Sequence, residues 1–79
     1  MARLLFRWDP GKARANEAKH GVSFDEAMTV FGDPLARIFD DPDHSLDEHR
    51  EILLGHSSRG RLLVVCFTER RPVIRIFSA

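Results

Sequence analysis

The chain has 79 residues, of which 43% are hydrophobic, and its 12 Lys and Arg residues balance 12 Asp and Glu residues to a formal net charge of zero. A chain of this length forms one domain, residues 1–79, that buries only about 60% of its unfolded surface, so we expect a partner or self-association to support its core. The longest apolar run, residues 62–67, is too short for a membrane span, and the N-terminal segment is too short and too soon charged for a secretory signal. A single cysteine cannot form an intramolecular disulfide. Together these features predict a cytoplasmic protein.

The charges are distributed unevenly along the chain. Residues 1–23 contain five basic and two acidic residues, a net charge of +3, whereas residues 24–48 contain eight acidic residues and one arginine, a net charge of −7. Residues 49–79 contain six arginines and two glutamates, a net charge of +4. Such asymmetry suits a local anion-binding surface in a neutral protein, and it is equally typical of ordinary charge balance on solvated faces.

The N-terminal segment predicts a strand followed by a helix. Residues 3–8 are rich in Leu, Phe and Trp, which favours a first strand. Asp9 is then an N-cap with Pro10 at the first helical position, and the helix runs from about Pro10 to His20. Gly21 follows as the residue that ends the helix in the left-handed conformation.

A second helix is predicted to begin after Ser23. Ser23 and Glu26 have the spacing of a capping box, in which each side chain binds a backbone N–H at the start of the helix. An apolar stripe at helical spacing predicts the face that covers the sheet. Its members are Phe24, Ala27, Met28 and Phe31. The segment Gly32-Asp33-Pro34 ends this helix.

Four strands are predicted to follow. They lie at Leu35–Phe39, His49–Gly55, Arg61–Glu69 and Val73–Ser78, with a polar turn at 40–47 and shorter connections at 56–60 and 70–72. The third of these strands is apolar on both faces in its middle, as a central strand should be. The order β-α-α-β-β-β-β predicts an α+β fold with two helices packed on one face of a largely antiparallel sheet.

The first predicted helix is unusually polar. Its only apolar residues are three alanines, and its other side chains include Lys12, Arg14, Asn16, Lys19 and His20. Burial does not explain such a helix. We expect Lys12 and Lys19 to bind phosphate at the rim of an anion-binding face, and the alternative is that they only keep an exposed helix soluble.

Arg75 is the strongest single candidate for chemistry on phosphate, because a planar guanidinium binds two phosphate oxygens at once. Alternation places Ile74 and Ile76 on one face of the last strand and Arg75 on the other, so Arg75 should point to the open face of the sheet. The alternative is a structural ion pair. Its possible partners are Glu48, Glu51 and Glu69.

Arg50 and Arg61 are the other arginine candidates. Parity groups Arg50 with Ile52 and Leu54, which predicts that Arg50 points at the core face unless a strand end or a bulge changes the alternation. Arg61 stands beside a glycine at the start of a strand. It is expected either to contact phosphate or to be a loop arginine with no role.

Chemistry on a phosphate group can also involve proton transfer, for which the sequence offers two candidates. Histidine is the residue type whose ordinary pKa lies near neutral pH, so His20 suits this role, although the dipole at a helix C-terminus favours a protonated histidine without any function. Glu48 could act as the base or could anchor Arg50. The catalytic candidates are therefore Arg50, Arg75, Glu48 and His20, and the phosphate-binding candidates are Lys12, Lys19 and Arg61.

A metal site is not expected from the sequence. Acidic and histidine side chains gather in residues 40–49, but their spacing matches neither an EF-hand loop nor a zinc motif. Oxygen-rich turns of this kind usually contact only solvent. We therefore expect neither a metal nor a cofactor.

Several short motifs follow one another along nearly the whole chain. They are Trp8-Asp9-Pro10 with Lys12 and Asn16, then KHGVSFDEA (residues 19–27), FGDP (31–34), EHR (48–50), GRLLVV (60–65), TER (68–70) and IRIFSA (74–79). In this order they resemble the BrnT-type toxins. The resemblance implies a RelE-like fold and an endoribonuclease toxin that cleaves RNA without a metal. It also implies a BrnA-like antitoxin, a ribbon-helix-helix DNA-binding protein, in a heterotetramer of two toxins and a dimeric antitoxin.

One feature departs from that resemblance. Members of the family usually continue past residues 74–79 with another arginine and a C-terminal helix, whereas this chain stops at Ala79. We expect activity to be impaired if such a tail supplies a catalytic or antitoxin-contacting residue. The competing function is a non-catalytic protein-binding module that docks a DNA-binding partner, and a third is an RNA-binding domain with salt-sensitive affinity.

Overall fold

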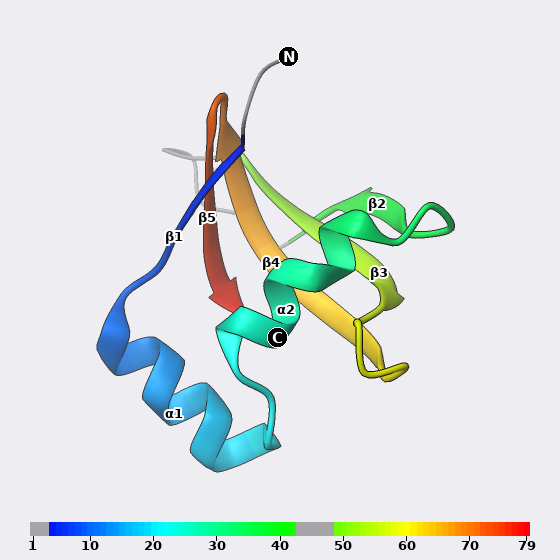
Figure 1. Cartoon of the computed structure of the whole chain (residues 1–79). Coiled ribbons are helices and arrows are strands. Elements are labelled where there is room, and N and C mark those ends of the chain that lie inside the picture. Colours follow the sequence, from blue (N-terminus) through cyan, green and yellow to red (C-terminus); the bar gives the residue numbers. More distant parts are fainter. Residues whose placement is uncertain (1–3, 43–48) are drawn as a thin grey trace.

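The computed structural model describes residues 4–42 and 49–79, whose arrangement is shown in Figure 1. In chain order the elements are β1 (Leu5–Arg7), α1 (Pro10–His20), α2 (Phe24–Thr29), the 3-10 turn η1 (Val30–Gly32), β2 (Arg37–Asp40), β3 (Arg50–His56), β4 (Leu62–Arg70) and β5 (Val73–Ser78). The α+β class and the order β-α-α-β-β-β-β predicted from the sequence are confirmed. None of the helices described is long and apolar enough to cross a membrane.

The five strands form one sheet in the order β1-β5-β4-β3-β2. β1 runs parallel to β5, and the other three neighbouring pairs are antiparallel. β4 therefore lies at the centre, as its apolar sequence predicts. β1 and β2 form the two edges of the sheet.

Local capping explains the bounds of α1. The Asp9 carboxylate accepts a hydrogen bond from the Lys12 backbone N–H at 2.9 Å, and Pro10 follows the cap. Gly21 ends the helix with a left-handed φ of 69°, and its N–H donates to the Glu17 carbonyl. Asp9 and Gly21 are the capping residues that the sequence predicts, and the helix has the predicted bounds.

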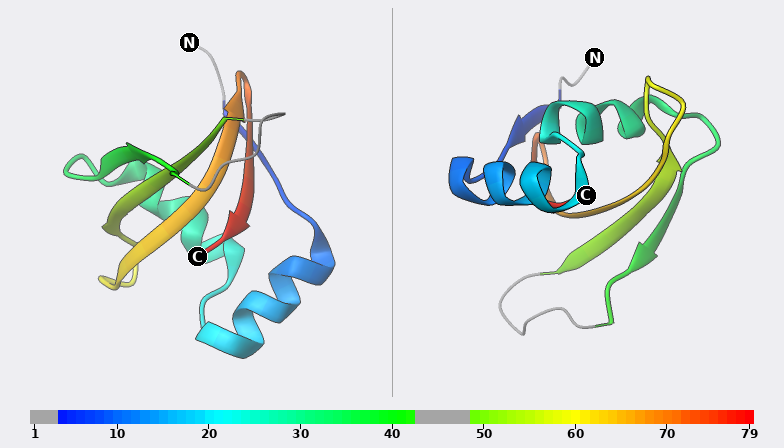
Figure 2. Two further views of the ribbon diagram at one scale, coloured as in Figure 1. Left: turned by 180° about the vertical axis from the view of Figure 1, so that it is seen from behind. Right: turned by 90° about the horizontal axis from the view of Figure 1, so that it is seen from below.

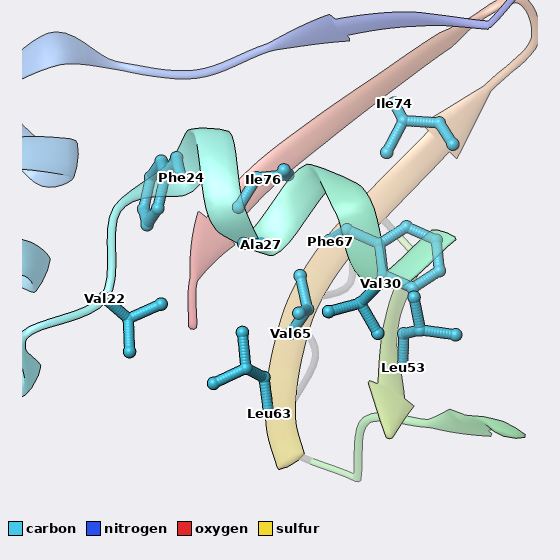
Figure 3. Close-up of a cluster of buried hydrophobic side chains, with 10 residues drawn as sticks. All are labelled: Val22, Phe24, Ala27, Val30, Leu53, Leu63, Val65, Phe67, Ile74 and Ile76. Atoms are coloured by element: carbon cyan, nitrogen blue, oxygen red, sulfur yellow. The ribbon is translucent and has the colours of Figure 1, made fainter. Parts of the chain in front are cut away.

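The core lies between one face of the sheet and the segment formed by α2 and η1 (Figure 3). Its ten buried residues are Val22, Phe24, Ala27, Val30, Leu53, Leu63, Val65, Phe67, Ile74 and Ile76. The Phe31 ring makes edge-to-face contacts with Phe6 and Phe67, with centroids 5.1 and 5.0 Å apart. Figure 2 shows the opposite side of the sheet, which no described helix covers and which we call the open face.

α1 lies beside the C-terminal end of β5 (Figure 1). Its one buried residue is Asn16, whose amide donates to the Val22 carbonyl at 3.1 Å and to the Ala79 carbonyl at 2.9 Å. The Asn16 carbonyl in turn accepts from the Ala79 N–H at 3.2 Å. The buried Asn16 amide thus ties this polar helix to the residue after β5 and to the segment before α2, while Ala13 packs against the core.

The predicted capping box is only half present. Ser23 Oγ accepts from the Glu26 N–H at 3.1 Å, but the Glu26 carboxylate turns inward instead of back toward Ser23. Arg61 Nε donates to Glu26 Oε2 at 2.9 Å, Arg61 Nη2 donates to Oε1, and the Ser57 hydroxyl donates to Oε2 at 2.7 Å. Mainly through the hydrogen bonds from Arg61 and then Ser57, the pKa of Glu26 is held at about 2, although burial opposes this shift.

The prediction that Arg50 faces the core was wrong. Leu53 is buried and pairs with Ile38 and Val65 on the helix-covered side. Because side chains alternate along β3, Arg50 belongs with Ile52 and Leu54 on the open face. The grouping by parity was correct, but the sequence did not show which of the two apolar sets of β3 the helices cover.

We expect the Glu26 contacts to make stability depend on acidic pH. The folded-state pKa of about 2 lies below the ordinary value of 4.5, so the stabilisation is complete above pH 4.5 and is lost as the pH falls toward 2. Urea unfolding followed by Trp8 fluorescence between pH 7 and pH 2 measures this. Glu26→Gln should be less stable at pH 7, and its stability should fall less steeply below pH 4.5.

Asp25→Asn is the matched control, because Asp25 is the neighbouring carboxylate of α2 and is exposed. This variant should keep the steep loss of stability between pH 4.5 and 2. Equal pH dependence of the wild type and Glu26→Gln would contradict the role assigned to Glu26.

Candidate functional site

Three arginines lie in one row across the open face. Arg50 of β3 pairs with Thr68 of β4, Thr68 pairs with Arg75 of β5, and Arg75 pairs with Arg7 of β1. Paired residues of neighbouring strands project to the same face, and the strand spacing separates the Cα atoms of Arg50 and Arg75 by about 10 Å. We call Arg7, Arg75 and Arg50 the arginine row.

Arg75 is exposed at the middle of this row. It lines one hollow of about 390 Å³ with Phe6, Arg7 and Trp8, and a second of about 380 Å³ with Thr68, Arg70 and Val73. Among residues 4–42 and 49–79 it forms no ion pair, and the Glu69 carboxylate instead accepts from Arg71 at 2.5 Å. Within the described chain, Arg75 is therefore available to an external anion.

Phe77 connects the arginine row to α1. Phe67 pairs with Ile76 and Cys66 pairs with Ser78, so Phe77 is the extra residue of a β-bulge, a device that re-aims side chains. The Arg50 guanidinium carbon lies 4.2 Å from the centre of the Phe77 ring, and the Lys12 ammonium lies 5.5 Å from it. Both distances suit cation–π attraction, so one ring contacts cations from both β3 and α1.

A groove of about 260 Å³ runs between α1 and the end of β5. It is lined by Lys12, Ala15, Asn16, Lys19, His20, Phe77 and Ser78. The α1 members recur at spacings of three, four, seven and eight residues, which place them on one face of a helix. Lys12, Lys19 and His20 therefore share the face of α1 that borders Phe77.

The structure thus brings together five of the residues that the sequence singled out. Lys12, Lys19 and His20 line the groove, Arg50 contacts its Phe77 wall, and Arg75 lies two positions before Phe77 on the same strand. Four of the five carry a full positive charge, and a histidine is the fifth.

Two predicted residues do not join this group. Arg61 lies at the start of β4, where it contacts the Glu26 carboxylate and donates to the Gly21 carbonyl at 3.1 Å. Its hydrogen bonds to Glu26 raise the pKa of the Arg61 guanidinium above its ordinary value. Glu48 lies outside the described residues. The geometry therefore gives Arg61 a part in holding α2 to the sheet.

One group of side chains within the described ranges has the composition of a metal site. Single ligand atoms of Asp40, His49 and Glu51 all lie within 4.8 Å of one another. Asp40 and Glu51 are a cross-strand pair, and the His49 ring already contacts Asp40 at 3.1 Å. Since Asp40 and His49 are exposed, contact between them accounts for this arrangement without a metal.

The sequence analysis did not single out Phe77 or Arg7 as site residues. The signal for Phe77 was present, because alternation places it with Arg75 and opposite Ile76. Arg7 gave no comparable signal. Only the parallel pairing of β1 with β5, strands far apart in the sequence, brings Arg7 beside Arg75.

This arrangement suits the backbone of a nucleic acid. Guanidinium and ammonium groups bind phosphate oxygens, and a histidine side chain lines the same groove as the two lysines. The positive charge is local, since the chain as a whole is neutral. The site therefore favours one short stretch of phosphodiester over extended nonspecific binding.

Comparison with known proteins agrees with this chemistry. No curated protein matches the sequence significantly. The model of the family described as the ribonuclease toxin, BrnT, of type II toxin–antitoxin systems matches residues 8–79, which includes every element from α1 to β5. The chain therefore belongs to the BrnT family of ribonuclease toxins, and its membership of a type II toxin–antitoxin system implies an antitoxin partner.

Proposed function

We propose that this protein is an endoribonuclease that cleaves cellular RNA in the cytoplasm by acid–base phosphodiester transfer, with no metal or cofactor. The observation that carries the proposal is the contact of Arg50 and Lys12 with the Phe77 ring, two residues after Arg75 on β5. The order of elements supports the RelE-like fold implied by the sequence resemblance.

In the proposed reaction the 2′-hydroxyl of RNA attacks the adjacent phosphorus. A base takes the hydroxyl proton, the bond from phosphorus to the 5′-oxygen breaks, and an acid gives that oxygen a proton. The products are a 2′,3′-cyclic phosphate and a 5′-hydroxyl. Negative charge builds on the non-bridging phosphate oxygens, so cations placed beforehand lower the barrier.

Arg75 and Arg50 are proposed to stabilise this charge. Their separation of about 10 Å lets two flexible side chains approach one phosphate from opposite sides of Thr68. Lys12 and Lys19 are proposed to bind neighbouring phosphates along the groove. Phe77, which lines the groove, contacts the cations of both Arg50 and Lys12.

His20 is the proposed proton-transfer residue among the described side chains. It lies at the last position of α1 and lines the groove beside Lys19. Glu48 is proposed as a second proton-transfer residue, on the strength of its carboxylate and its position two residues before Arg50 in the sequence. One of the two would act as the base and the other as the acid.

The partner is proposed to be a BrnA-like antitoxin of the ribbon-helix-helix class, in a heterotetramer of two toxins and two antitoxins. Membership of a type II family supports an antitoxin. A protein that binds such a partner tightly and leaves RNA intact would instead be a docking module.

We expect Arg50→Ala and Arg75→Ala each to lower the rate of RNA cleavage by about 10²–10³-fold, the usual effect of removing one donor to transition-state charge. The assay is single-turnover cleavage of a labelled RNA in EDTA by protein freed of antitoxin. Arg75→Lys should recover only part of the rate, because an ammonium lacks the planar fork.

Arg14→Ala is the matched control for these variants, since Arg14 is exposed on α1 and does not line the groove. It should cleave like the wild type. Wild-type rates in both Arg50→Ala and Arg75→Ala, or loss of all cleavage on adding EDTA, would overturn the proposed mechanism.

Lys19→Ala and His20→Ala should weaken cleavage more than they weaken folding, because both side chains are exposed and line the groove. Loss of a single proton-transfer group typically costs about 10²-fold or more in rate. Urea unfolding gives the comparison. Asn16→Ala should show the opposite pattern and lose about 1–3 kcal/mol of stability, because it strands buried polar groups.

The pH profile separates the two roles within this pair. His20→Ala should remove one limb of the pH dependence of cleavage, whereas Lys19→Ala should lower the rate equally at every pH. If both variants lose stability and keep full activity, α1 is only a polar spacer.

A further inference from the structure

The open face has a second half that the proposed site does not use. Beside the arginine row, the register aligns Phe39 of β2 with Ile52 of β3 and Cys66 of β4, and aligns Leu54 with Val64. Leu62 precedes Val64 by two residues in β4 and therefore lies on the same face. We call these residues the apolar patch; they are Phe39, Ile52, Leu54, Leu62, Val64 and Cys66.

The apolar patch is exposed, although the apolar sequence of β4 predicts burial. The middle of β4 is apolar on both faces, which predicts cover on both sides. The helices cover only the side of Leu63, Val65 and Phe67, and the other side leaves Leu62 61% exposed and Val64 52% exposed. On the neighbouring edge strand, Phe39 is 49% exposed. Contiguous apolar surface of this kind marks sites of protein interaction.

Arginines border the apolar patch on two sides. On one side Arg50 lies two residues before Ile52, and Thr68, two residues after Cys66, pairs with Arg75, whereas the corresponding residue of the β2 segment is a carboxylate, Asp41. On the other side Arg37 pairs with Leu54 and is exposed. A complementary partner therefore presents apolar side chains with carboxylates on both sides of them. A second copy of this chain would bring arginines to the same border and fits it less well.

We propose that the apolar patch binds the antitoxin through an amphipathic acidic segment. Its apolar side chains would cover Phe39, Leu62 and Val64, and its carboxylates would pair with Arg37 and Arg75. This inference rests on the antitoxin implied by the family, and it deepens the proposed function by naming the surface at which inhibition occurs. A segment seated there reaches Arg75 and excludes RNA from the arginine row.

The test compares two adjacent residues of one edge strand. Phe39 and Ile38 are 49% and 56% exposed, and alternation sends them to opposite faces of β2. The probe is the purified cognate antitoxin, and the measurement is its Kd by isothermal titration calorimetry. Thermal melting of every variant confirms that it is folded.

Phe39→Glu and Val64→Glu should each raise the Kd for the antitoxin by about 10²-fold, as truncation of central interface residues does. Ile38→Glu should change it less than about threefold. Arg37→Glu should also raise the Kd and should reduce its dependence on salt, because a screened charge pair has been removed. If Val64→Glu fails to fold, Val64→Ser takes its place with a smaller increase.

RNA cleavage by the same proteins, freed of antitoxin, separates this proposal from the proposed function. All four variants should cleave at nearly the wild-type rate and should escape inhibition at antitoxin concentrations that silence the wild type. If the wild type does not cleave RNA but the Kd values follow the predicted pattern, the proposed function is contradicted and the docking surface is supported.

Three results would overturn the docking proposal. One is an unchanged Kd for Phe39→Glu and Val64→Glu. Another is an equal loss of affinity for Ile38→Glu, which would place the antitoxin on the edge of β2 and not on its open face. The last is impaired RNA cleavage or loss of a toxin dimer in Phe39→Glu and Val64→Glu with normal antitoxin binding, which would assign the patch to RNA or to a second copy.

Discussion

The burial of one face of the sheet under α2 and η1 is the constraint on which the rest of this structure depends. Leu53, Val65 and Ile76 enter that core from three neighbouring strands, and the period of two then sends every alternate side chain to the other face. The chemistry of the arginines and of the exposed apolar residues does not determine the face on which they lie. They are presented to solvent because their neighbours are buried.

The open face that results is divided by strand register into two halves with different chemistry. The cationic half is the arginine row, which crosses β3, β5 and β1 at the level of Thr68 in β4. The apolar half is the apolar patch, which lies beside that row on β2, β3 and β4. Proximity of the two halves has a functional consequence. A partner held by apolar contacts on one half is positioned to block an anion site on the other.

Arginines with and without a carboxylate partner serve different purposes in this chain. Arg61 is neutralised by Glu26, a carboxylate that is only 6% exposed and that also accepts from Ser57, so this pair joins α2 to the turn before β4. Breaking such a pair leaves a charge without compensation. Arg75 makes no such contact within the described residues, and Arg50 lies against the Phe77 ring. The arginine that pairs with a buried carboxylate helps to hold the fold, and Arg75 is available to phosphate.

The sequence by itself determined the features that depend on neighbours along the chain. Asp9 and Gly21 mark the ends of α1, because a helix cap needs only atoms within one helical turn. The span of β5 and the exposure of Arg75 follow from the alternation of side chains along residues 73–78. Only the tertiary structure decided which face of β3 is buried, and so where Arg50 points. The Glu26–Arg61 pair, 35 residues apart, and the meeting of α1 with Phe77 were likewise beyond local patterns. The reason is physical: period and capping are short-range, whereas the choice of buried face is made by whichever packing removes the most apolar surface from water.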